Sequence, residues 1–255
     1  MDSPLQLLVV PYLRDNYAFL LADRARGEAV VVDCGEAEPV LRRLEQEGLR
    51  PVALWATHHH ADHVGGIEAL LGALGPVEVV GSRHDAERGR IPGLCRAVED
   101  GETLHFAGQA VQVLHVPGHT LGALAFLVGE RWLFTGDTLF LGGCGRLFEG
   151  DAPTMAASLR RLAALPGDPL VCCGHEYTEA NLRFALQVDP DNEALRDRYE
   201  HVCARRARGE PTVPAPLSLE RATNPFLRAE RLARPGESAV AAFARLRALK
   251  DRWRG

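Results

Sequence analysis

Short apolar runs punctuated by glycine or aspartate follow one another along the first two thirds of the chain. Each run is rich in valine, leucine or aromatic residues, a composition that is typical of β-strands. The runs lie at residues 5–10, 17–22, 29–35, 52–58, 77–82, 110–116, 123–128, 131–137 and 169–175. The pattern therefore predicts a region built mainly from strands up to about residue 175.

Helical patterns interrupt these runs at residues 37–47, 65–74 and 153–165. Apolar side chains recur there at the three- and four-residue intervals that place them on one face of a helix. The order of elements mixes hairpins, in which one strand directly follows another, with strand–helix units. We therefore expect a mixed sheet covered by helices in an α+β protein, and not a doubly wound parallel sheet.

The pattern changes after about residue 175. Residues 177–187 and 192–209 have helical spacing, and the second segment carries an apolar stripe. The stripe consists of Leu195, Tyr199, Val202 and Cys203. A proline-rich crossing at 210–226 leads to a last helix at 237–253, and no convincing strand pattern follows residue 175. We predict two domains, 1–175 and a small α-helical domain at 176–255.

Composition narrows the classes of protein that this chain can represent. Its 255 residues are 46% hydrophobic and 25% charged, as in an ordinary globular protein. A net charge of -5, without a block of like charges, argues against a nucleic-acid partner. No apolar run approaches the roughly 20 residues that span a bilayer, and the N-terminal residues lack the positive start of a signal peptide. We expect a cytoplasmic monomer without a membrane partner.

The six cysteines change this picture little. No two of them form a C-x-x-C pair. In a chain of this size they are expected to be reduced and mostly buried thiols, and not a disulfide framework.

Residues 57–63 read "THHHADH" and follow an apolar run. His58 and His60 are two residues apart in an extended segment, so their side chains point to the same side while His59 points away. Asp62 and His63 come next, where the chain turns toward a helix. Imidazole nitrogens and carboxylate oxygens are ligands that zinc and similar cations take in proteins. The segment therefore predicts a metal site.

Three more polar residues occupy the same context, a strand end marked by a preceding glycine. They are His119 in "PGHT", Asp137 in "GDT" and His175 in "CGH". Loops at one edge of a sheet are where binding groups converge, so these side chains are expected near His58. Seven ligands are too many for one tetrahedral ion and suit two ions that share a carboxylate. The remaining histidines, which lack this context, are expected to be structural: His59, His84, His105, His115 and His201.

The motifs "THHHADH", "PGHT" and "GDT", with the final "GH", resemble the signature of the metallo-β-lactamase superfamily. The resemblance implies an αββα sandwich with a binuclear site on one edge. One metal would be bound by His58, His60 and His119, the other by Asp62, His63 and His175, and Asp137 would bridge them. Asp33 matches a position that supports the ligands without binding metal itself.

Four further segments carry a more specific resemblance. Residues 136–151, 173–185, 224–228 and 245–251 are similar to hydroxyacylglutathione hydrolase, also called glyoxalase II. The similarity runs over nearly the whole chain and includes the C-terminal helical region. It implies hydrolysis of the thioester S-D-lactoylglutathione to glutathione and D-lactate, the second step of methylglyoxal detoxification. A hydroxide that bridges the two metals would attack, and Asp62 would orient it.

The same resemblance implies a set of glutathione contacts: Arg146, Phe148, Tyr177, Arg247 and Lys250. Cationic side chains can donate charge-assisted hydrogen bonds to the two carboxylates of glutathione. Arg247 and Lys250 lie three apart and so share a face of the last helix, although a solvated face paired with Asp251 is the alternative. Many relatives carry tyrosine at the position of Phe148, which cannot donate a phenolic hydrogen bond. Arg146 replaces a frequent lysine, and a planar guanidinium binds carboxylates differently from a compact ammonium.

Three other functions compete with this interpretation. A glutathione persulfide dioxygenase with a single iron shares the histidine motif and "PGHT", but the long helical C-terminal region argues against it. A metal-dependent phosphodiesterase acting on RNA would need a basic face, and a non-enzymatic scaffold would not need every ligand. The ligands do not determine the metal: zinc is our first expectation, and iron and manganese can occupy such sites.

Overall fold

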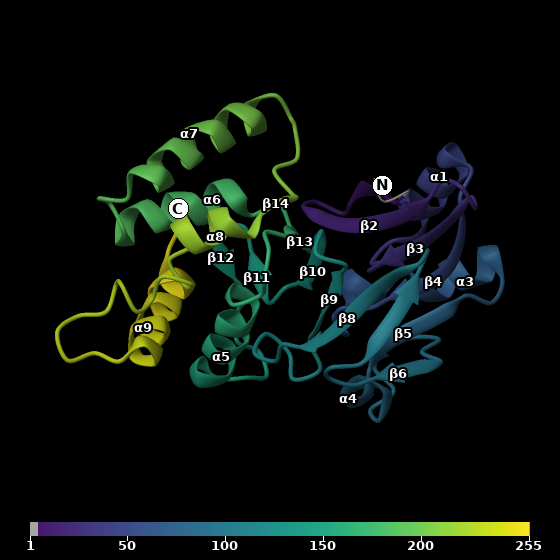
Figure 1. Ribbon diagram of the computed structural model, residues 1–255, viewed down its shortest axis with the longest axis horizontal. Helices are drawn as coiled ribbons and strands as arrows, with labels where there is room; N and C mark the ends of the chain where they lie inside the picture. Colours follow the sequence, from purple (N-terminus) through teal and green to yellow (C-terminus); the bar gives the residue numbers. More distant parts are fainter. Residues whose placement is uncertain (1–4, 255) are drawn as a thin grey trace. The chain divides into compact units, whose positions relative to one another are not determined.

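The computed structural model describes residues 5–254, which divide into two compact units. The first unit contains residues 5–115 and 122–129, and the second contains 116–121 and 130–254. Each unit has strands and helices of its own (Figure 1). No helix in the described part of the chain is long and apolar enough to cross a membrane.

A six-stranded mixed sheet forms most of the first unit. Its strands, in spatial and chain order, are β1 (Leu5–Tyr12), β2 (Asn16–Asp23), β3 (Glu28–Val32), β4 (Arg50–Trp55), β5 (Glu78–Ser82) and β6 (Arg96–Val98). The first three pair antiparallel as hairpins, and β3 to β6 pair parallel. Every residue of β2 is buried, as expected for a strand covered on both faces.

Helices α1 (Ala37–Glu47) and α3 (Ile67–Leu74) provide apolar cover for this sheet. Val40 and Leu44 of α1 and Ile67 of α3 belong to one buried core with strand residues such as Leu54. Helix α1 ends at Gly48, whose positive φ of 62° lets its N–H reach the carbonyls of the last turn. The loop after β4 begins at the edge of this core, because Leu54 and Ala56 belong to the core.

Smaller elements complete the first unit. Strands β7 (Thr103–Phe106), β8 (Gln109–His115) and β9 (Leu124–Val128) pair antiparallel in succession. Two single-turn helices, α2 (Ala61–Val64) and α4 (Arg83–Ala86), follow β4 and β5. Helix α2 carries the second half of the histidine motif, so these side chains lie on helical backbone.

In the second unit, β10 (Trp132–Gly136) pairs parallel with β13 (Leu170–Cys173), and β13 pairs antiparallel with β14 (Ala215–Pro216). A two-residue hairpin, β11 (Leu139–Phe140) with β12 (Gly143–Cys144), lies between β10 and α5 in the chain. Gly142 in its turn has a φ of 68°, a conformation that glycine adopts without strain. The hairpin is buried along its length.

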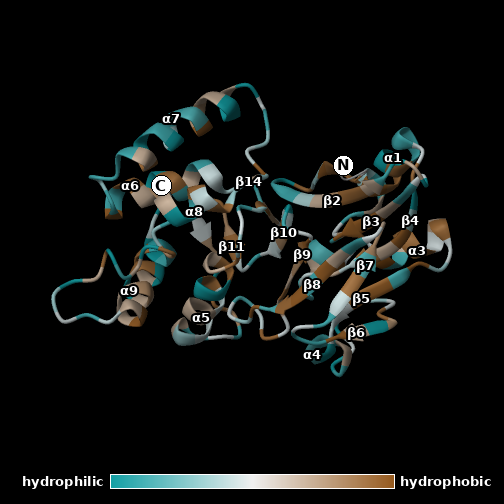
Figure 2. Cartoon of the chain, in the orientation of Figure 1, coloured by the Kyte–Doolittle hydropathy of each residue, from teal (hydrophilic) through white to brown (hydrophobic). Residues whose placement is uncertain are grey.

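Five helices follow in the second unit: α5 (Ala152–Ala163), α6 (Thr178–Val188), α7 (Glu193–Ala207), α8 (Leu217–Thr223) and α9 (Ala239–Arg252). Side chains of Asp151, Asn192 and Ser238 accept backbone N–H bonds at the starts of α5, α7 and α9. Helix α7 is largely hydrophilic (Figure 2), and it buries Leu195 and Val202 against α6.

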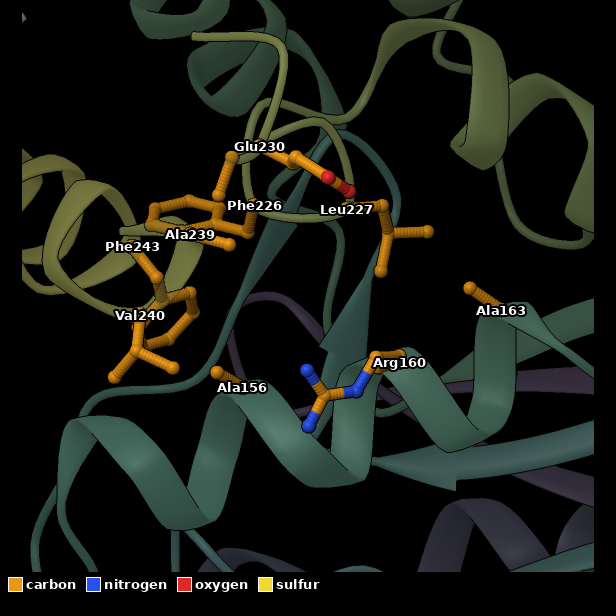
Figure 3. A pocket seen from close by; sticks show the side chains of 10 residues that line it. Ala156, Arg160, Ala163, Phe226, Leu227, Glu230, Ala239, Val240 and Phe243 are labelled. Atoms are coloured by element: carbon orange, nitrogen blue, oxygen red, sulfur yellow. The ribbon is translucent and has the colours of Figure 1, made fainter. Parts of the chain in front are cut away.

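Helices α5 and α9 lie side by side around a cavity of about 140 Å³ (Figures 1 and 3). Its wall is mainly apolar, and the Arg160 side chain of α5 points into the opening. Phe226 and Phe243 meet edge to face with ring centroids 5.6 Å apart. Aromatic contact therefore holds α9 against the segment that follows α8.

The α+β class, the mixed sheet and the C-terminal helical region agree with the sequence prediction. All the predicted runs contain strands, whereas β6 and β7, which carry polar residues, and the two-residue strands β11 and β12 were not predicted because they are short. The expectation of no strand after residue 175 is wrong at β14, where prolines keep the chain extended at a sheet edge. The domain boundary at 175 stays a prediction.

Candidate metal centre

The loop that leaves β4 brings His58 and His60 together. His58 Nε2 lies 3.1 Å from His60 Nδ1, and the two rings meet edge to face. His59 is directed elsewhere, with Nδ1 3.2 Å from the buried carboxylate of Asp85. This is the alternation that extended backbone imposes on consecutive side chains, as the sequence predicted.

Asp33 fixes the orientation of the groups around it. The Thr57 N–H and hydroxyl each donate to its carboxylate at 2.8 Å, and His63 Nδ1 lies 2.8 Å from Oδ2. A carboxylate only accepts, so His63 carries its proton on Nδ1. The remaining nitrogen, Nε2, then faces the Asp62 carboxylate at 3.8 Å. Asp33 therefore supports a candidate ligand in the manner that the resemblance implied.

The same network determines the tautomer of His58. The Thr57 hydroxyl donates its proton to Asp33, so it can only accept from His58 Nδ1, which lies 3.1 Å away. His58 therefore directs an unprotonated Nε2 toward His60. Both His58 and His63 present Nε2 as an acceptor, which is the form of imidazole that binds a cation.

Asp62 is held by contacts to its backbone carbonyl and to its carboxylate. The Tyr12 hydroxyl donates to the Asp62 carbonyl at 2.6 Å, and burial raises the pKa of Tyr12 above its ordinary value, so the phenol remains a donor. Asn16 Nδ2 donates to the Asp62 carboxylate at 3.1 Å. A Cβ at Gly35 would lie 2.2 Å from the Asp62 carbonyl oxygen, so only glycine permits this approach.

In the second unit, the loops after β10 and β13 place Asp137 beside two histidines. Asp137 Oδ2 lies 3.5 Å from His119 Nε2 and 3.4 Å from His175 Nε2, and all three residues are buried. His119 Nδ1 donates to the Arg146 carbonyl at 2.9 Å. His119 therefore presents an unprotonated Nε2 to the carboxylate of Asp137.

These separations suit a bound cation. Two ligands at about 2.0–2.1 Å from one tetrahedral ion lie about 3.3 Å apart. The pairs within each unit are separated by 3.1, 3.8, 3.5 and 3.4 Å. At His63–Asp62 and His119–Asp137, an acceptor nitrogen faces an acceptor oxygen, and a cation stabilises such an arrangement. The donor set and its spacing thus fit divalent metal ions.

Each of the seven predicted ligands belongs to at least one group of three His and Asp side chains that could hold a metal ion. They are His58, His60, Asp62, His63, His119, Asp137 and His175. Among the described residues, none of the histidines that the sequence prediction set aside belongs to such a group.

Aromatic rings flank two of these histidines. Tyr177 stacks on His175 with centroids 4.7 Å apart and planes 8° apart, and Phe140 meets both rings edge to face. Phe148 meets His119 edge to face at 5.2 Å and is 63% exposed. Both predicted contact residues, Tyr177 and Phe148, thus lie beside candidate ligands and partly face solvent.

The three predicted cationic contacts differ in exposure. Arg146 is exposed, Lys250 is partly buried and Arg247 is buried. Lys250 Nζ lies over the Trp253 and Phe184 rings, at 4.2 and 5.2 Å. Burial, followed by the positive charges of Arg247 and Arg146, lowers the pKa of Lys250 to about 8. An anionic group close to Lys250 would relieve this electrostatic cost.

Sequence reasoning missed several supporting residues. Tyr12, Asn16 and Asp85 lie outside the ligand motifs, and their contacts with the "THHHADH" segment cross 26 to 50 positions of the chain. Asp85 had one local signal, since it follows Ser82 by three residues in an N-cap.

Two family models match the chain in succession. Residues 12–175 match the metallo-β-lactamase superfamily, and residues 176–253 match the hydroxyacylglutathione hydrolase C-terminus. Together they cover nearly the whole chain.

Relatives agree with these models. A hydroxyacylglutathione hydrolase of Gloeobacter violaceus is 52% identical over 248 residues, covering 94% of this chain and 97% of the relative. One of a Synechococcus strain is 50% identical over 254 residues, covering 98% and 100%. The crystal structure of TTHA1623 in a di-iron-bound form is 29% identical, with a TM-score of 0.59, covering 87% of this chain and all of that one.

Proposed function

We propose that the chain performs the reaction of the family to which it belongs, the hydroxyacylglutathione hydrolases of the metallo-β-lactamase superfamily. It is a thioester hydrolase that converts S-D-lactoylglutathione and water to glutathione and D-lactate. The carbon–sulfur bond of the thioester breaks, a carbon–oxygen bond forms, and the thiolate of glutathione takes up a proton. The observation that carries this proposal is the family match over both the metal-ligand region and residues 176–253.

The seven residues described above would hold two divalent cations, with zinc as the first expectation. His58, His60 and His119 would form one ligand set, Asp62, His63 and His175 would form the other, and Asp137 would be shared. Two of the three-residue groups that could hold an ion are these two ligand sets. The donors combine imidazole, which suits zinc and iron, with carboxylate, which suits manganese. When bound, such cations lower the pKa of water and polarise the thioester carbonyl.

The side chains of this protein orient the reactants. Asp62 is fixed by Tyr12 and Asn16, and its carboxylate is 39% exposed, so it can accept a hydrogen bond from the attacking water. Arg146, Arg247 and Lys250 bind the glutathione carboxylates, and Tyr177 supplies a hydroxyl beside His175. Phe148 contributes an apolar surface only, because a phenyl ring cannot donate a hydrogen bond.

The decisive experiment is thiol release from S-D-lactoylglutathione by the zinc-loaded chain, followed with a thiol reagent. We expect rapid release that is lost after metal removal and restored by added metal. No release from metal-loaded protein would reject the proposal. Oxygen uptake with glutathione persulfide then tests the single-iron dioxygenase, an alternative that the full-length hydrolase relatives do not favour.

We also propose that the chain acts as a monomer in the cytoplasm. All six cysteines are free, which suits a reducing compartment. Light scattering on the purified protein measures the oligomeric state, and a dimer mass at micromolar concentration would contradict the monomer.

Replacing Lys250 with alanine should weaken substrate binding without slowing the chemical step. Hydrogen bonds to charged groups are worth about 1.5–3 kcal/mol, and partial exposure reduces this value, so we expect KM to rise about tenfold. The turnover number should stay within about twofold because no reacting atom is touched. Arg252→Ala, an exposed cation on the same helix, is the control and should leave KM unchanged. An equal fall in kcat and kcat/KM would contradict a pure binding role.

Substrate binding should also weaken as the pH rises through about 8. The pKa of Lys250 in the free protein is lowered to about 8, so its charge is present below that pH and lost above it. We expect KM to be flat from pH 6 to 7 and to rise above pH 8 until it levels off near the roughly tenfold higher value expected for Lys250→Ala. In Lys250→Arg the guanidinium stays charged, and the rise should disappear. A rise of the same size in that variant would assign the titration to another group.

A further inference from the structure

Residues 144–146 lie directly against two candidate metal ligands. A Cβ at Gly145 would be 2.1 Å from the Asp137 carbonyl oxygen and 2.9 Å from His119 Nδ1. The next carbonyl, that of Arg146, accepts the His119 Nδ1 proton at 2.9 Å. The position of this backbone therefore determines the tautomer and the orientation of His119.

Side chains from the C-terminal region hold the backbone that leads into this segment, including its first residue. Each reaches a different group of the β11–β12 hairpin, and each is nine-tenths or more buried. Asn181 donates to the Leu141 carbonyl at 3.1 Å, Glu220 accepts from the Gly142 N–H at 2.7 Å, Asn224 donates to the Gly143 carbonyl at 2.9 Å, and Arg247 donates to the Cys144 carbonyl at 2.9 Å. Buried backbone groups need such partners, so the hairpin depends on these helices.

Of the four hairpin groups, the Cys144 carbonyl that Arg247 binds is the nearest in the chain to Gly145 and Arg146. Asp251 accepts from its Nε and Nη2, at 3.1 and 2.9 Å, and its guanidinium lies over the Phe226 ring at 5.1 Å. Its side chain is 7% exposed. A guanidinium oriented by a carboxylate and an aromatic ring is rigid, and its charge strengthens the bond to the Cys144 carbonyl.

Building on the proposed metal centre, we propose that Arg247 is a positioning residue that holds residues 144–146 so that they orient His119. Helix α9 thereby contributes to metal retention, in addition to any contact with substrate. Groups that orient a ligating histidine typically change metal affinity 10–100-fold when they are removed. A residue that only bound glutathione would leave metal retention unchanged.

The test measures zinc release without substrate. Wild-type protein and Arg247→Met are loaded with Zn²⁺, and the rate at which a chromogenic chelator removes the metal is recorded. We expect at least about tenfold faster release from the variant, with a fall in kcat as well as a rise in KM. Lys250→Met is the matched control, because it removes a cation from the same helix whose hydrogen bond goes to the Ala180 carbonyl and not to the hairpin backbone, and its release rate should stay within twofold of wild type.

Release at the wild-type rate from folded Arg247→Met would overturn the proposal, even if KM rises. If Arg247→Met does not fold, Asp251→Asn takes its place, since Asp251 is 44% exposed and its carboxylate orients the Arg247 guanidinium. Faster release is then expected, and an unchanged rate overturns the proposal. Absence of thiol release from zinc-retaining wild type would reject the proposed function and leave this comparison valid. Failure of wild type to take up Zn²⁺ would reject both.

Discussion

Replacing Asp137 with alanine should abolish turnover and lower the metal content of the purified protein. The Asp137 carboxylate lies 3.5 Å from His119 Nε2 and 3.4 Å from His175 Nε2, and it is the ligand that both proposed ions share. A metal ion supplies several kcal/mol of transition-state stabilisation. Since 1.4 kcal/mol corresponds to a factor of ten, we expect kcat to fall on the order of 10³-fold or more.

The measurement pairs metal analysis by plasma mass spectrometry with thiol-release kinetics. Asp191→Ala is the control, because it removes an exposed carboxylate from the same unit, and it should retain full metal content and activity. Undiminished activity of Asp137→Ala with one metal per chain would reject the two-metal model. Full metal content together with full activity would remove Asp137 from the site altogether.

The second large effect concerns stability. Replacing Glu220 with alanine should lower the free energy of unfolding by about 3–5 kcal/mol, because it leaves the buried charge of Arg198 without its partner. Glu220 is fully buried and forms an ion pair with Arg198, and it also accepts from the Gly142 N–H at 2.7 Å and from Asn224 at 3.0 Å. We expect thermal unfolding to shift down by roughly 10 °C.

A surface ion pair provides the comparison. Glu179 pairs with Arg183 one turn along α6, where both side chains are more than one-third exposed. Glu179→Ala should cost less than about 1 kcal/mol, as is usual for exposed pairs. Calorimetry measures the unfolding temperature of both variants. Equal small shifts would mean that the hydrogen bonds and the ion pair of Glu220 contribute little to stability. The unfolding temperature of Glu220→Gln should lie between those of Glu220→Ala and wild type.

The local sequence pattern was sufficient to predict those structural features that depend only on residues close together in the chain. The apolar run 17–22 became the fully buried strand β2, and helix α1 has the predicted limits of 37 and 47. The convergence of His58 and His60 follows from the two-residue period of extended backbone, which is a property of the chain itself. Strand β7 escaped prediction because four residues with alternating exposure carry too weak a pattern.

The pattern of residue types along the sequence could not predict contacts between residues that are far apart in the chain. Arg247 and the Cys144 carbonyl are 103 residues apart, and Glu220 and Gly142 are 78 apart. A periodic helix face identifies Arg247 and Lys250 as neighbours, yet it cannot tell that one is buried under a hairpin and the other partly faces solvent. Burial of a charged side chain is decided by which element packs over it.

The sequence by itself determined the strand-rich first part, the helical last part, the candidate ligands and the family, because these depend on residue type and on spacing along the chain. Only the tertiary structure decided which nitrogen of His58, His63 and His119 carries the proton, since that depends on acceptors brought in from elsewhere in the fold. It also decided that the C-terminal helices hold the backbone beside His119. A buried polar group needs a partner, and folding alone determines which residue supplies it.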